Sequence, residues 1–227
     1  MEHVVRLLST LALKGAIRRL AGQYRAAAAT QIDADFAPTL GLLERLRKGE
    51  TADVVILTKE GLDELVAEGT VAAESKVELA RSYVGIAVKA GDRHPDIATA
   101  QALRTALLGA RSVAYSKIGA SGIFFARLIE HLGIASEVNA MAAITSGFTA
   151  ERLITGEADL AVQQISELKQ VSGIEIVGPI PYELQTPAVF SAGRMAASKE
   201  ATQADSLLRF LASEETAPVL RESGLEP

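Results

Sequence analysis

Hydroxyl side chains stand where apolar runs of this chain give way to helical patterns. Ser9 and Thr10 follow the run 4–8, and Thr39 opens the helical pattern after the run 32–36. Hydroxyl groups, and the free N–H groups at the start of a helix, donate hydrogen bonds to anions. These positions therefore predict an anion site, although a Ser or Thr at a helix start also serves as a simple cap.

A second group of such residues follows the run 113–116. The stretch SKIGASG, residues 116–122, leads from that run into an apolar helical pattern. Its glycines allow backbone N–H groups to approach an anion closely, and the helix dipole adds about half a positive charge there. Two amides end the later run 159–163. The candidate ligand-binding residues are Ser9, Thr10, Thr39, Ser116, Ala120, Ser121, Gly122, Gln163 and Gln164.

Three nearby side chains could act as a base or hold a ligand charge: Lys14, Tyr115 and Lys117. They matter if the site moves a proton, because that step needs a base near the reacting carbon and donors for the developing negative charge. Lys14 is open to a second interpretation as an exposed residue of the first helix. The catalytic residues are therefore left undecided by the sequence.

Other chemistries lack the residues that they need. The chain has no cysteine, and its histidines, His3, His94 and His131, lie far apart without metal-ligand spacing. It contains neither the G-x-S-x-G element of a serine hydrolase nor a nucleotide-binding glycine loop. We therefore expect no metal and no cofactor.

Charge and hydropathy limit the partners. The 227 residues carry a net charge of −5 at pH 7, which disfavours nucleic acid. No stretch approaches the roughly 18 consecutive apolar residues of a membrane span, so we expect a soluble protein. The N-terminus lacks a signal-peptide pattern, which indicates a cytoplasmic protein as the sequence stands. If a leader had been removed, the protein would be periplasmic and an ABC permease would be its partner.

The elements that position these residues alternate between short apolar runs and amphipathic helical patterns. This alternation is typical of an α/β fold with a parallel sheet. The predicted strands cover residues 4–8, 32–36, 53–57, 79–89, 113–116, a stretch near Val138, 159–163, 174–177 and 186–192. The predicted helices lie around residues 13–24, 42–46, 60–68, 99–108, 122–132, 149–154, 200–212 and 215–223.

Two extended segments, near 80–90 and 182–193, flank a middle block that repeats the strand-helix rhythm. This predicts two α/β lobes joined by two crossings of the chain. We expect residues 1–81 and 187–227 in one lobe, residues 85–180 in the other, and hinge segments at 82–84 and 181–186. Ligands of open α/β sheets bind beyond the carboxyl ends of the strands, so we expect the site in the cleft between the lobes.

Several longer segments resemble a known family. The segments LRKGETADVVILTKEGLDELVAEG, ARSYVGIAVKAG, YSKIGASG and LITGEADLAVQQISEL are similar, in this order, to type II periplasmic solute-binding proteins. The likeness is to the molybdate-binding branch that includes aconitate isomerase. It implies two Rossmann-like α/β lobes joined by two hinge strands, closing over an oxyanion held by hydroxyls and amides without a metal.

The resemblance also implies which residues hold the ligand. Ser9, Thr39, Ser121 with Ala120, and Gln163 or Gln164 match ligand positions of the family. The glutamines stand where molybdate binders have tyrosine, and Pro38 stands where they have a run of serines. These departures point away from molybdate and toward a small organic acid.

Two functions remain open after this comparison. The first is capture of a small carboxylate or oxyanion with hinge closure, as in a solute-binding protein. The alternative is a cytoplasmic isomerase that shifts an allylic proton in a small unsaturated polycarboxylate. Both use the same donors, and only the second needs a base.

Overall fold

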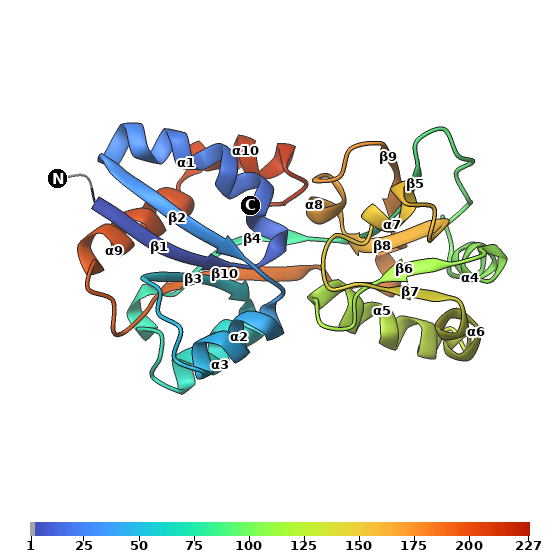
Figure 1. Ribbon diagram of the computed structural model, residues 1–227, viewed down its shortest axis with the longest axis horizontal. Coiled ribbons are helices and arrows are strands. Elements are labelled where there is room, and N and C mark those ends of the chain that lie inside the picture. Colours follow the sequence, from blue (N-terminus) through green and yellow to red (C-terminus); the bar gives the residue numbers. More distant parts are fainter. Residues whose placement is uncertain (1–2) are drawn as a thin grey trace. The chain divides into compact units, whose positions relative to one another are not determined.

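Two β-sheets, each with its own core, organise the computed structural model, which describes residues 3–227 (Figure 1). Unit 1 consists of the residues up to Arg81 together with Ala188–Pro227, and unit 2 of Ser82–Pro187. The chain therefore leaves unit 1 once and returns to it once. That the two connections, at the predicted segments 82–84 and 181–186, act as hinges stays a prediction.

The sheet of unit 1 has the strand order β2-β1-β3-β10-β4. β1 is parallel to both of its neighbours, whereas β10 is antiparallel to β3. The expected parallel sheet is therefore mixed, because β10 enters this unit from the other end of the chain. The strands are β1 (His3–Ser9), β2 (Thr30–Phe36), β3 (Val54–Thr58), β4 (Val77–Ser82) and β10 (Ala188–Arg194).

Helices cover both faces of the unit 1 sheet. One face packs on α1 (Lys14–Ala28), α9 (Ala201–Leu211) and α10 (Ala217–Glu222). The other face packs on α2 (Thr39–Arg47) and α3 (Lys59–Ala67). Short 3₁₀ turns complete the unit: η1 (Leu11–Leu13), η2 (Ala73–Ser75) and η4 (Glu214–Thr216).

Helix α1 shows why the sequence periodicity works. Ile17, Leu20 and Tyr24 lie on one helical face and are buried against the sheet. The exposed side carries arginines. Burying an apolar stripe in this way supplies most of the stability of a short helix. The predicted inward face is therefore confirmed.

The sheet of unit 2 has the strand order β7-β6-β8-β5-β9. β6 is parallel to β7 and β8, whereas β5 is antiparallel to β8 and β9. The carboxyl ends of β6, β7 and β8 therefore meet at one edge. The strands are β5 (Val84–Lys89), β6 (Val113–Tyr115), β7 (Ala142–Ile144), β8 (Leu160–Gln164) and β9 (Ile174–Pro179).

Unit 2 also has helices on both faces. α4 (Ala100–Gly109), α5 (Ala120–His131) and α6 (Ala135–Ala140) cover one face. α7 (Glu151–Ile154) and α8 (Ile165–Leu168) cover the other. A 3₁₀ turn, η3 (Tyr182–Leu184), precedes the return to unit 1.

Two sequence predictions about these elements were wrong. The stretch 79–89 is not one crossing strand, because β4 ends at Ser82 in the first sheet and β5 starts at Val84 in the second. The weak strand near Val138 is helix α6, followed by β7. Ile134 and Val138 are both fully buried and lie four residues apart, which is helical spacing.

The segments that connect the units are themselves tied within unit 2. The Gln185 side chain accepts a hydrogen bond from the Val84 N–H at 2.9 Å and donates one to the Val84 carbonyl at 3.2 Å. The rings of Tyr83 and Tyr182 meet edge to face, with centroids 5.0 Å apart. Within residues 3–227, no helix is long and apolar enough to cross a membrane.

Candidate functional site

The parallel strands of unit 1 bring hydroxyl residues together at their carboxyl ends. Ser9, the last residue of β1, pairs in register with Phe36 of β2 and Ile56 of β3. The Thr10 N–H donates to the Ile56 carbonyl at 2.9 Å, and the Ala37 N–H donates to the Ser9 carbonyl at 3.1 Å. The segment Ser9-Thr10 is therefore held between the ends of β2 and β3, as the strand-end argument expects.

Thr39 meets a residue that the sequence reasoning missed. The Thr58 N–H, at the end of β3, donates to the Thr39 hydroxyl at 3.4 Å, and the Gly61 N–H donates to the Thr58 hydroxyl at 3.3 Å. Thr58 follows the predicted strand 53–57 and opens a helix, which is the same pattern that singled out Thr39. The signal was thus present in the sequence. A Cβ at Gly61 would stand 2.8 Å from the Thr39 methyl, so this contact is tight.

The two neighbouring hydroxyls at the end of β1, those of Ser9 and Thr10, differ in their availability to a ligand. The Ser9 hydroxyl donates to the Thr10 carbonyl at 3.1 Å. Thr10 as a whole residue is only 4% exposed, and its hydroxyl makes no hydrogen bond to any residue in the described part of the chain. Thr10 is therefore the better placed of the two to donate to a ligand.

Ser116 shapes the loop at the carboxyl end of β6 in unit 2. Its hydroxyl accepts from the N–H groups of Ile118 and Gly119, both at 3.3 Å. Gly122, in the first turn of α5, packs so closely that a Cβ there would lie 1.4 Å from the Ser116 carbonyl oxygen. The glycine thus allows the helix to pack closely on the loop, while its predicted role in letting N–H groups approach an anion stays a prediction.

Ser121 stands in the first turn of α5 and is 2% exposed. Its hydroxyl has no hydrogen-bond partner among residues 3–227. The N–H groups of Ala120 and Ser121 belong to the first turn, which an α-helix leaves without internal acceptors. This helix start combines free donors with the positive end of the helix dipole, which is a favourable place for an anion.

Gln163 has another role than the expected one. Its side-chain oxygen accepts from the Thr149 N–H at 2.7 Å and from the Thr149 hydroxyl at 3.1 Å. Its side-chain nitrogen donates to the Gly147 carbonyl at 3.1 Å. Gln163 therefore holds the loop that follows β7, and its contact with a ligand stays a prediction without a free donor to support it.

Gln164 points toward the connection between β4 and β5. With its amide nitrogen turned to this connection, it donates to the carbonyls of Ser82 at 3.0 Å and Tyr83 at 3.1 Å. Ser82 also shares a hydrogen bond with Ser166, with the two hydroxyl oxygens 3.3 Å apart. The strand end at Gln164 thus anchors the connecting segment.

Glu167 is a buried acid that the sequence reasoning did not single out. Burial raises the pKa of its carboxyl to about 8, although the Gln164 N–H and the Gln163 side-chain amide lower it. Gln164 is the N-cap of α8 and Glu167 lies three residues later, the spacing at which a glutamate reaches back to the N-cap. The sequence shows the pattern Q-x-x-E, but it does not show that the glutamate is buried.

The three candidate bases have different surroundings. Tyr115 is buried in the core of unit 2, where its ring packs on Phe125 and its hydroxyl hydrogen-bonds Asn139; burial raises its pKa. Lys14 begins α1, with its ammonium 5.9 Å from the centre of the Phe36 ring. Lys117 is exposed on the loop before α5. Tyr115 therefore serves packing, which leaves the lysines as the accessible candidates.

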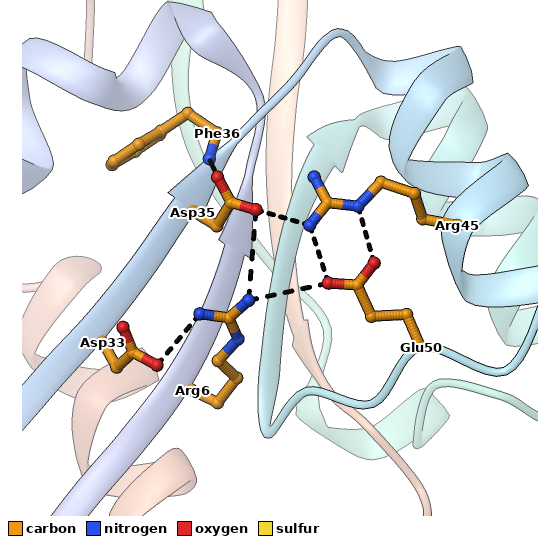
Figure 2. A network of polar contacts seen from close by, with 6 residues as sticks. All are labelled: Arg6, Asp33, Asp35, Phe36, Arg45 and Glu50. Atoms are coloured by element: carbon orange, nitrogen blue, oxygen red, sulfur yellow. Dashed lines mark hydrogen bonds and ion pairs between the residues drawn. The ribbon is translucent and has the colours of Figure 1, made fainter.

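An ionic network fixes the helix that carries Thr39 (Figure 2). Arg45 of α2 bridges Asp35 of β2 and Glu50, with 2.6 Å from its Nε to a Glu50 oxygen. Arg6 of β1 lies 3.6 Å from the same Glu50. Hydrogen bonds from Arg45 lower the pKa of both carboxyls. α2 is thereby tied to β1 and β2.

The described part of the chain has no cluster of side chains suited to bind a metal ion. Residues 3–227 contain no group of three or more His, Asp or Glu side chains that could hold a metal ion. The donors at the strand ends are hydroxyls and backbone N–H groups, which suit anions rather than cations.

Taken together, the two α/β units, with donors at the carboxyl ends of their strands, have the type II periplasmic-binding fold. Residues 5–226 match the family of bacterial extracellular solute-binding proteins, and the chain belongs to this family.

One relative and several solved structures are similar to the chain over nearly its full length. An aconitate isomerase from Pseudomonas sp is 36% identical over 228 residues, which cover 97% of this chain and 87% of the relative. The periplasmic molybdate-binding protein of Azotobacter vinelandii superposes with a TM-score of 0.84 at 16% identity, covering 98% and 99% of the two chains. The sulfate-binding protein of Mycobacterium tuberculosis gives 0.80 at 14% identity, covering 99% and 87%. At these identities the structures support the fold alone.

Proposed function

We propose that the protein binds a small anion, a carboxylate or an oxyanion, with donors at the strand ends of both units. The observation that carries this proposal is a pair of nearly buried residues, Thr10 in unit 1 and Ser121 in unit 2, whose hydroxyls make no hydrogen bond within residues 3–227. Each lies where a β-strand gives way to helical structure.

Neither hydroxyl is used by the protein itself, so both remain available to donate to a ligand oxygen. A ligand oxygen would satisfy both the Ser121 hydroxyl and the first-turn N–H groups of α5. Bonds from such donors to a charged oxygen are stronger than bonds between neutral groups. The names of the molybdate-binding and sulfate-binding proteins of the same fold add support for an anion.

The test is calorimetric titration of the wild-type protein and a Ser121→Ala variant with molybdate, sulfate, succinate and trans-aconitate. Loss of one hydrogen bond to a charged group should weaken binding roughly tenfold to a hundredfold. Ser172→Ala is the matched control, because Ser172 is an exposed serine in a turn of the same unit. Equal affinity of Ser121→Ala and wild type for every bound anion would refute the role of Ser121.

A second candidate function is an allylic proton shift in a small unsaturated polycarboxylate. The 36% identity to an aconitate isomerase favours it. A base would remove the proton from the allylic carbon, the C–H electron pair would form the new double bond, and the former double bond would take a proton at its far carbon. Lys14 and Lys117 are the accessible candidates for this base.

Proton NMR of cis- and trans-aconitate with the protein in deuterated buffer separates the two functions. An isomerase exchanges the allylic hydrogens for deuterium and interconverts the isomers. A receptor binds the acid and does neither. Lys14→Met and Lys117→Met then assign the base, because only loss of the true base stops the exchange while binding persists.

The two candidate functions imply different cellular compartments and different partners for the protein. As a receptor, the protein would deliver its ligand to an ABC permease from outside the cytoplasmic membrane, in keeping with its family of extracellular proteins. As an enzyme, it could act in the cytoplasm. Fractionation of cells that express the native gene, followed by immunoblotting, tests which compartment holds it.

A further inference from the structure

Large apolar side chains are exposed beside the hydroxyl donors of unit 2. Ile118 is 39% exposed on the loop between Ser116 and α5, and Ile144 is 42% exposed at the end of β7. A single exposed isoleucine needs no explanation. Two of them stand beside Ser121, whose hydroxyl has no partner within residues 3–227, so this surface offers both an apolar and a polar part.

The backbone brings these two isoleucines to the same sheet edge. Ile144 pairs with Tyr115 across β7 and β6, and the Thr145 N–H donates to the Tyr115 carbonyl at 3.2 Å. Ile118 is anchored in the adjoining loop, where its N–H donates to the Ser116 hydroxyl. Both therefore flank the strand end from which α5 and Ser121 continue.

Side-chain alternation fixes the face on which Ile144 lies. Residues two apart in a strand point to the same face, so Ile144 shares a face with Ala142. Ala142 packs in the cluster beneath α4, α5 and α6. Ile144 thus lies on the face that α5 covers, beyond the end of the packed core.

A tetrahedral oxyanion has no apolar surface to offer these side chains. A multi-carbon carboxylic acid does, because methylene or vinyl groups separate its charged ends. Burying such a group against an isoleucine contributes roughly 0.8 kcal/mol per CH₂, which is about a fourfold gain in affinity. The pattern of donors with adjacent apolar walls matches an organic acid.

We infer that Ile118 and Ile144 contact the hydrocarbon segment of the ligand and so select di- or tricarboxylates over inorganic oxyanions. This inference rests on the proposed anion-binding function. Unit 1 offers a parallel feature, because Leu40 follows Thr39 in the first turn of α2 and is 46% exposed.

The experiment is calorimetric titration with molybdate, malonate, succinate, glutarate and trans-aconitate. It compares wild type, Ile118→Ala, Ile144→Ala and the double variant. Ile154→Ala is the matched control, because Ile154 is 44% exposed in the same unit but lies in α7, away from these strand ends. All three substituted isoleucines are exposed, so their replacement should leave the fold intact. Circular dichroism verifies that each variant is folded.

We expect wild type to bind carboxylates more tightly than molybdate. We expect each variant to lose roughly tenfold in affinity for its tightest carboxylate, with no change for Ile154→Ala. Unchanged carboxylate affinity in the double variant, or wild-type preference for molybdate, would overturn the inference and leave anion binding intact. If no probe binds wild type, or Ser121→Ala binds every probe like wild type, the proposed function itself fails and the inference falls with it.

Discussion

Glu167 shows how a single residue couples stability to pH. Its carboxyl is buried, and burial raises its pKa from an ordinary value of 4.5 to about 8. No charged neighbour contributes to this shift. Between these two values the unfolded chain has lost this proton while the folded chain keeps it. The contribution of Glu167 to the free energy of unfolding therefore falls as pH rises through this window.

Glu167→Gln should remove this penalty, since glutamine keeps the shape and suits the same helix position. We expect the variant to match wild type near pH 5 and to exceed its free energy of unfolding near pH 9 by up to about 5 kcal/mol. Urea denaturation at several pH values measures the difference. Parallel pH profiles of the two proteins would contradict a buried, neutral Glu167.

Gly122 is a second residue with a sharply defined role. A Cβ at this position would overlap the Ser116 carbonyl at 1.4 Å, so the loop or the helix must move to admit one. We expect Gly122→Ala to lower the free energy of unfolding by about 1 to 3 kcal/mol and to weaken anion binding.

Gly109→Ala is the control for this substitution. Gly109 ends α4 in the same unit, and no atom lies within 4 Å of the Cβ that alanine would add. Alanine favours a helix over glycine, so we expect unchanged or slightly higher stability. Thermal and urea unfolding measure both variants, and equal stability of the two would show that Gly122 has room after all.

The surroundings of the candidate site residues were only partly predictable from the sequence. A hydroxyl after an apolar run marked Ser9, Thr39 and Ser121, and the same rule applied to Thr58 would have found it. Hydrogen-bond partners come from distant segments, so Gln163 could not be recognised as the support of the loop at Thr149. Periodicity shows where a side chain stands, but not whether its donors are already used.

At the scale of elements, α2 illustrates how a site helix is held in place. Its N-terminus carries Thr39, and Arg45 near its other end joins Asp35 and Glu50 (Figure 2). These groups are partly exposed, with 31% of the Arg45 side chain accessible, so solvent screens their attraction. The network therefore sets the position of the helix more than the stability of the unit.

Arg45→Met should lower the free energy of unfolding at pH 7 by only about 1 kcal/mol or less, after allowance for screening. The pKa values of Asp35 and Glu50 are lowered in the folded state, so their contribution is present above the ordinary values and is lost as pH falls below them. Wild type and variant should converge as pH falls through the lowered pKa values of these two carboxyls.

Arg47→Met, in the same helix, is the control for the Arg45 substitution. Arg47 pairs with Glu64 and Glu68 at the exposed surface, where salt screens such pairs. We expect little change in stability from its loss. A larger effect for Arg47→Met than for Arg45→Met in urea denaturation would contradict the anchoring role of Arg45.

The sequence predicted the type of an element correctly where a long apolar stripe is buried. The prediction was wrong where the apolar stretch was short. The stripe of α1 has 15 residues to display its period, whereas α6 has only six. A short apolar stretch fits either a strand or a helix, so the element near Val138 was misjudged. The antiparallel direction of β10 could not be predicted from the sequence either, because β10 pairs with β3 from the far end of the chain.

At the scale of the whole molecule, the return of the chain makes unit 1 depend on two distant segments, whereas unit 2 is one continuous stretch. β10 completes the first sheet, and α9 and α10 cover its face. The resumed strand-helix rhythm predicted two lobes. The family match over residues 5–226 and the superposition on periplasmic binding proteins confirm that fold class.

The central claim is that strand-end donors of both units bind one class of small anion. The most direct measurement is a titration of the ¹⁵N-labelled protein with trans-aconitate, followed through the backbone amide resonances. We predict that the amides of Thr10, Thr39, Ala120 and Ser121 shift the most and yield a single dissociation constant, at one acid per chain. Shifts confined to one unit, or centred away from these strand ends at the start of α4, would contradict the account.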